Sequence, residues 1–127
     1  MAKLGATSLK RLSGCDTRLQ AIVEMVEREY PRDFTVVCGH RDEEAQEKAF
    51  REGTSKAHFG ESRHNSIPSM AVDIAPYATG KIRWGDTESF LLLATYMFRT
   101  AQQMGWPIEW GGHFKSWSDM PHWELTN

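Results

Sequence analysis

The sequence predicts an α+β fold, a small and mainly antiparallel sheet with helices packed on one side. Segments with helical and strand character do not alternate regularly along the chain, and the expected strands are few and short. These two observations exclude a doubly wound parallel sheet. The length of 127 residues fits a single compact domain, 1–127, that can bury its own core.

The first half of the chain predicts two helices separated by a strand. Apolar residues recur at three- and four-residue steps over 17–30, which predicts an amphipathic helix that ends before Pro31. The run 34–38 is rich in β-branched and aromatic residues and predicts a buried strand. A second helix is expected over about 43–52, where Gly53 ends it.

The second half predicts a long loop, a strand, a core helix and two short strands. Residues 53–70 lack periodicity and are rich in glycine, serine, asparagine and proline, so we expect a functional loop. The compact β-like run 71–75 is followed by Pro76, which we expect to close the strand. The apolar helix that follows and the two short strands are expected over 86–104, 108–110 and 123–125.

Charge and hydropathy exclude several functions. A formal net charge of -2 provides no basic field for binding nucleic acid. No apolar run approaches the roughly 18 residues that a membrane span needs. The N-terminal stretch lacks the apolar core and cleavage site of a secretory signal, so we expect the protein to begin in the cytoplasm and to need a separate pore to leave it.

The two cysteines, Cys15 and Cys38, are far apart in the sequence and form no C-x-x-C pair. This arrangement argues against a cysteine zinc site. We expect two reduced, half-buried thiols.

A candidate catalytic zinc site comes from two histidines and one aspartate. Catalytic zinc commonly uses three His, Asp or Glu ligands and keeps a fourth position for water. Strand alternation sends Asp73 to the face opposite Val72 and Ile74, and a charge inside an apolar strand costs several kcal/mol unless a partner compensates it. We expect one Zn²⁺ per chain, held by His64, Asp73 and His122.

Peptide hydrolysis at such a site also needs a general base, and two carboxylates are candidates. Asp119 precedes His122 by three residues across a turn, from which it can reach a metal-bound water. Glu124 shares a strand face with His122 and is either the rival base or an acceptor that holds the ligand imidazole by its other nitrogen. We favour Asp119 as the catalytic base.

Several sequence blocks, taken in order, resemble the zinc peptidases that cut peptidoglycan stem peptides. This family unites D-alanyl-D-alanine carboxypeptidases with the L-alanyl-D-glutamate endopeptidases of bacteriophage lysis, and the aspartate before the final histidine resembles the phage endolysin branch. The resemblance implies the fold of hedgehog and D-Ala-D-Ala peptidase domains. The matching blocks are Gly39-His-Arg41 with Glu44 and Gln46, Ser62-Arg-His64, Ala71-Val-Asp73, Glu109-Trp-Gly-Gly112 and Asp119-Met-Pro-His122-Trp-Glu124.

The resemblance also implies roles for residues outside the metal site. Arg41 would bind a substrate carboxylate or stabilise the oxyanion of the tetrahedral intermediate. Ser62 would position substrate or support His64, and Gln46 would contact substrate. Three tryptophans are expected to line the substrate groove: Trp110, Trp117 and Trp123.

The expected function is that of a monomeric phage endolysin that hydrolyses the L-alanyl-D-glutamate bond of the peptidoglycan stem peptide. Such a protein would wait in the host cytoplasm until a holin or similar pore admits it to the periplasm and cell wall. Two alternatives stay open at this point. One is a D-alanyl-D-alanine carboxypeptidase, and the other is a non-catalytic, zinc-stabilised binding module.

Overall fold

The structure is a computed structural model that describes residues 4–114 and 118–126. Helices and strands do not alternate regularly along the chain. The long helix α4 separates the first three strands, β1 to β3, from the last two, β4 and β5. The helices are α1 (Ala6–Ser13), α2 (Thr17–Glu29), α3 (Glu43–Arg51) and α4 (Thr87–Met104). The strands are β1 (Phe34–Cys38), β2 (Ala71–Ala78), β3 (Lys81–Ile82), β4 (Ile108–Trp110) and β5 (His122–Leu125), and two 3₁₀ turns are η1 (Arg63–Asn65) and η2 (Gly111–His113).

The strands form an open sheet in the order β1-β2-β5-β4, and the short β3 pairs with the far end of β2. Each of these pairings is antiparallel. The late strand β5 therefore lies inside the sheet, between β2 and β4, although it comes last along the chain. This architecture confirms the α+β fold with a mainly antiparallel sheet.

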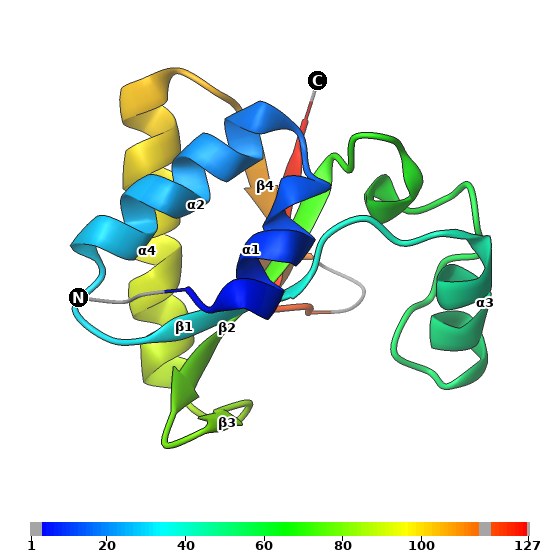
Figure 1. Ribbon diagram of the computed structural model, residues 1–127, viewed down its shortest axis with the longest axis horizontal. Helices are drawn as coiled ribbons and strands as arrows, with labels where there is room; N and C mark the ends of the chain where they lie inside the picture. Colours follow the sequence, from blue (N-terminus) through cyan, green and yellow to red (C-terminus); the bar gives the residue numbers. More distant parts are fainter. Residues whose placement is uncertain (1–3, 115–117, 127) are drawn as a thin grey trace.

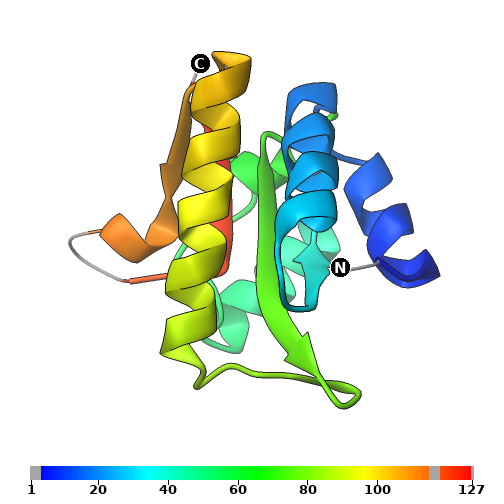
Figure 2. The ribbon, with the colours of Figure 1, turned by 90° about the vertical axis from the view of Figure 1, so that its left-hand side faces the viewer.

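Helices α2 and α4 pack against each other and cover one face of the sheet (Figures 1 and 2). Val72 and Ile74 of β2 and Leu125 of β5 point into the core beneath these helices. Helix α3 lies apart from α2 and α4, on the other side of the sheet (Figures 1 and 2). One face of the sheet therefore forms the core, and the opposite face is left for a site.

The helix boundaries follow from local capping. Asp16 accepts a hydrogen bond from the backbone N–H of Arg18 at the start of α2, and Asp86 accepts one from Ser89 at the start of α4. Helix α4 ends at Gly105, whose φ of 76° is the left-handed conformation that glycine adopts without steric cost. Among residues 4–114 and 118–126, no helix is long and apolar enough to cross a membrane.

The structure differs from the sequence-based expectation at several elements, and strand β3 and the two 3₁₀ turns were not expected. Helix α1 was not expected, because its short segment buries only Ser8 and Leu12. Strand β2 continues through Pro76 to Ala78, because the backbone pairs with β1 up to Pro76 and with β3 beyond it. Strand β5 begins at His122, one residue earlier than expected, so that this histidine is part of the sheet.

Candidate active site

Side chains from three neighbouring strands form a row across the open face of the sheet. Asp73 on β2 pairs with His122 on β5 and with Cys38 on β1. Since Val72 and Ile74 on either side of Asp73 are fully buried in the core, strand alternation directs the Asp73 carboxylate to the opposite face, as the sequence predicts. The pairing of β1 with β2 shifts between Val36 and Cys38, and this irregularity turns Cys38 out of the core and into the row.

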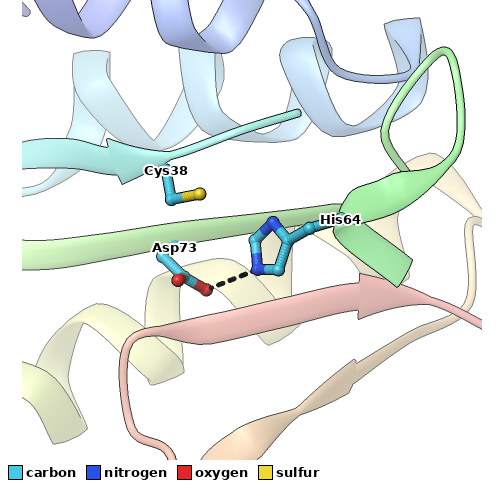
Figure 3. A group of neighbouring side chains, drawn as sticks. All are labelled: Cys38, His64 and Asp73. Carbon is cyan, nitrogen blue, oxygen red and sulfur yellow. Dashed lines mark hydrogen bonds and ion pairs between the residues drawn. The ribbon is translucent and has the colours of Figure 1, made fainter. Parts of the chain in front are cut away.

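His64 reaches the same row from η1. Ser62 begins this turn and accepts a hydrogen bond from the backbone N–H of His64 at 3.2 Å, so it supports the histidine as expected. The imidazole Nε2 of His64 lies 3.1 Å from Asp73 Oδ1 and 3.2 Å from His122 Nδ1. His122 Nδ1 in turn lies 3.2 Å from the same Asp73 oxygen. The structure thus brings His64, Asp73 and His122 together, and Figure 3 shows His64 and Asp73 facing each other beside Cys38.

In each imidazole, the ring nitrogen that points away from Asp73 lies beside an oxygen that can only accept a hydrogen bond. We call this nitrogen the outer one. His64 Nδ1 lies 2.7 Å from the carbonyl oxygen of Gly39, and His122 Nε2 lies 2.7 Å from Glu124 Oε1. Both outer nitrogens therefore carry the proton when the rings are neutral, which leaves a lone pair on each inner nitrogen. Two nitrogen lone pairs and a carboxylate oxygen then converge within 3.2 Å of one another, which is the donor set of a metal site.

The electrostatics of the three groups agree with this reading. Burial favours the neutral imidazole, but the adjacent Asp73 carboxylate outweighs it and raises the pKa of His64 to about 10. Burial also opposes the charged form of His122, yet its hydrogen bonds to Asp73 and Glu124 raise its pKa to about 9. Burial alone would raise the pKa of Asp73, whereas the two histidines lower it below its usual value. Without a cation the cluster takes up protons, and a bound cation would replace them.

Cys38 also lies within reach of this cluster. One donor atom each from Cys38, His64 and Asp73 lie within 4.8 Å of one another. The Cys38 thiol accepts a hydrogen bond from Arg41 Nη2 at 3.5 Å. The sequence argues against a cysteine zinc site because it contains no C-x-x-C pair, but it gives no sign that the irregular β1–β2 pairing places a single thiol beside the cluster.

Arg41 lies beside Asp73, and its guanidinium is fixed by a hydrogen bond to Gln46. Its Nη2 is 3.8 Å from Asp73 Oδ2, and its Nη1 donates to Gln46 Oε1 at 3.0 Å. Gln46 was expected to contact substrate, but it is 0% exposed, and its amide nitrogen donates to Ser55 and Ala57. The correction follows from this burial. Gln46 positions Arg41 and anchors the loop after α3. Of these two residues, only Arg41 lines the cleft.

The two candidate bases have different surroundings. Glu124 Oε1 accepts from His122, and its other oxygen lies 3.6 Å from Arg63 Nε, so hydrogen bonding to His122 lowers the pKa of Glu124. Asp119 lines the cleft in the turn before β5, and burial together with the charge of Asp73 raises its pKa. A base needs a pKa that is shifted towards neutral pH and a side chain that is free to reach substrate. Glu124 is engaged by His122 and Arg63, whereas Asp119 lines the cleft with a raised pKa.

A cleft of about 1100 Å³ opens over the cluster. Ser62 and Arg41 line it, as expected. Trp110 and Trp123 do not, because their rings stack at 5.6 Å in the core, where Trp123 is only 1% exposed. Trp117 lies outside the residues that the structure describes.

Two contributors to the site, the backbone carbonyl of Gly39 and the side chain of Asn65, were missed from the sequence. The Gly39 carbonyl that fixes His64 is a backbone group and leaves no mark on the sequence. Asn65 accepts hydrogen bonds from Gly60 and Ser62 and donates to the carbonyl oxygen of Arg41. A capping pattern in which Ser62 is followed three residues later by an amide side chain would have indicated this role.

Comparisons with known proteins agree with this geometry. The family model described as phage L-alanyl-D-glutamate peptidase matches residues 1–125. The chain is 29% identical over 117 residues to the L-alanyl-D-glutamate peptidase of Escherichia phage T5, covering 92% of this chain and 85% of that protein. It also superposes with a TM-score of 0.84 on the crystal structure of the Serratia marcescens L-Ala D-Glu endopeptidase ChiX, at 28% identity over 99% of this chain and 90% of that one. The fold, the open cleft and a match over almost the whole chain lead to one conclusion: the chain belongs to the phage L-alanyl-D-glutamate peptidase family.

Proposed function

We propose that this protein is a zinc-dependent endopeptidase that hydrolyses the L-alanyl-D-glutamate bond of the peptidoglycan stem peptide. The observation that carries the proposal is the convergence of two imidazole lone pairs and one carboxylate oxygen within 3.2 Å, on the floor of a cleft. The names of the phage T5 and Serratia relatives support the choice of scissile bond. They favour it over the D-alanyl-D-alanine carboxypeptidase and over a binding module without turnover.

The ion would be held by His64 Nε2, Asp73 Oδ1 and His122 Nδ1. The mutual distances among these three atoms favour them over a set that includes the Cys38 thiol, whose group spans up to 4.8 Å. When bound, zinc supplies Lewis-acid chemistry, polarising a carbonyl and acidifying water. Gly39 and Glu124 hold the two imidazoles in the tautomers that such binding requires.

The remaining steps belong to residues in the cleft wall. Asp119 takes a proton from the attacking water and delivers it to the departing amino group of D-glutamate, so that the peptide C–N bond breaks with no net change in the protonation of Asp119. The raised pKa of Asp119 suits both halves of this transfer. Arg41 lies close enough to Asp73 to stabilise negative charge on the carbonyl oxygen, and Gln46 fixes its direction.

We also infer that the whole chain acts as one catalytic domain. The core joins Leu4 and Leu12 of the N-terminal part to Trp123 and Leu125 of β5, so both parts of the chain contribute to the same hydrophobic cluster. We further propose that the chain binds one ion and acts as a monomer. It would reach the cell wall from the host cytoplasm through a separate pore.

The test is product analysis by mass spectrometry after digestion of purified peptidoglycan, with and without a chelator. Fragments with a new N-terminal D-glutamate, lost on chelation and restored by zinc, are the expected result. Release of free D-alanine instead would select the carboxypeptidase, and no metal-dependent product would refute a peptidase role. Asp119→Asn and His122→Ala, each checked for an unchanged circular dichroism spectrum, should both lose the product, but only His122→Ala should lose bound zinc.

A further inference from the structure

The two ends of the cleft differ in chemistry. One end is formed by the loop after α3 and by the residues before η1, and it carries Lys56, Glu61 and Arg63. Two further lining residues come from another part of the fold: Trp84, between β3 and α4, and Phe90 in the first turns of α4. Figure 1 shows these two regions well separated, with α3 at the right and β3 with the start of α4 at the lower left. Strand β2, which carries Asp73, runs between them.

Among the aromatic residues that the structure describes, Trp84 has the most exposed side chain. Its side chain lines the cleft and is 54% exposed, whereas Phe90, which also lines the cleft, is buried. An exposed indole in a concave site offers a large flat apolar surface with a polar N–H edge, and such surfaces commonly bind a ligand.

The proposed scissile bond also separates two chemically different halves of the substrate. The half that begins with D-glutamate carries free carboxylates, which suit the region of Arg63, whose side chain lies 3.6 Å from Glu124 but is still 42% exposed. The other half is L-alanine, which has only a methyl side chain, joined directly to muramic acid of the glycan strand. A single methyl group is too small to cover an indole, but the apolar face of a pyranose ring matches it in size.

We propose that Trp84 binds the muramic acid ring, so that the stem peptide lies with its sugar towards α4 and its glutamate towards the loop after α3. This inference rests on the proposed function and deepens it. The substrate recognised is then a stem peptide still attached to glycan. Trp84 acts in substrate binding and takes no part in the bond-breaking step.

The test compares two substrates that differ only in the sugar. One is a disaccharide stem peptide, and the other is the same peptide with its alanine nitrogen acetylated, which keeps that nitrogen an uncharged amide. Trp84→Ala should lower kcat/KM on the disaccharide peptide about tenfold, mainly through KM, since an aromatic stacking contact contributes roughly that factor. On the acetylated peptide it should leave kcat/KM unchanged. Trp84→Phe should retain part of the preference for sugar.

Leu91→Ala is the matched control. Leu91 is 51% exposed on α4 and does not belong to the described lining of the cleft, so its removal should change neither substrate's kcat/KM. An equal loss on both substrates for Trp84→Ala, or no loss on either, overturns the inference. If the unsubstituted protein cleaves neither substrate in the presence of zinc, the proposed function itself fails and takes this inference with it.

Discussion

Replacing Glu124 by glutamine separates its positioning role from that of a catalytic base. Glu124 Oε1 accepts a hydrogen bond of 2.7 Å from His122, and a glutamine oxygen can still accept it without the charge. A hydrogen bond to a charged group contributes about 1.5–3 kcal/mol and a neutral one about 1 kcal/mol, so the substitution should cost about 1–1.5 kcal/mol of zinc binding. The expected result is zinc affinity weakened about tenfold.

Two quantities need to be measured for each variant: the zinc dissociation constant, by competition with a chromophoric chelator, and kcat at saturating zinc. Glu124→Gln should weaken zinc binding and leave most of kcat once zinc is saturating. Asp119→Asn should leave zinc affinity nearly unchanged and lower kcat about 10²–10⁴-fold, the usual contribution of a general base. The opposite pattern, with zinc affinity intact and kcat lost in Glu124→Gln, would refute the assignment and make Glu124 the base.

Three further outcomes are expected. Gly111→Ala should destabilise the protein by about 1–3 kcal/mol and impair catalysis, because an added Cβ would lie 2.1 Å from the carbonyl oxygen of Asp119. Thermal melts and activity assays measure both effects. Gly85→Ala is the control, because an added Cβ there has no atom within 4 Å. In metal-free protein, the raised pKa values of His64 and His122 add stability that is complete below pH 6.5 and is lost as pH rises through about 9 and 10, so the melting temperature should fall across that window, and a flat profile would contradict it. Zinc binding at pH 7 should release protons, measured by calorimetry in buffers of different ionisation enthalpy, and an enthalpy that does not vary with the buffer would refute the protonated cluster.

The parts of the fold that sequence predicts well are those with strong local periodicity. The buried stripe of α2 and the apolar length of α4 lie where the three- and four-residue spacing predicts them. Helix α1 has no such stripe, since Ser8 is one of its two buried residues and is held by hydrogen bonds to Thr35 and Val36. Its formation depends on contact with β1, which local sequence does not encode.

The candidate site shows the same division. Alternation along β2 correctly places Asp73 opposite the core. The same rule applied to β5 puts Trp123 in the core, because His122 and Glu124 on either side of it point to the cleft. The expectation that Trp123 lines the substrate groove was therefore avoidable. The position of Cys38 was not predictable, because it depends on an irregular pairing between β1 and β2 that only the assembled sheet reveals.

The internal position of β5 affects how the protein is made. A growing chain on the ribosome has already produced α1 to α4 and every other strand before residues 122–125 emerge. Until then β2 and β4 lack the neighbour that joins them and expose unpaired edges, which favour aggregation. The same late segment brings His122 to the cluster. If His122 holds the proposed ion, hydrolytic activity begins only once the sheet is complete, and a product truncated before β5 should be both inactive and insoluble.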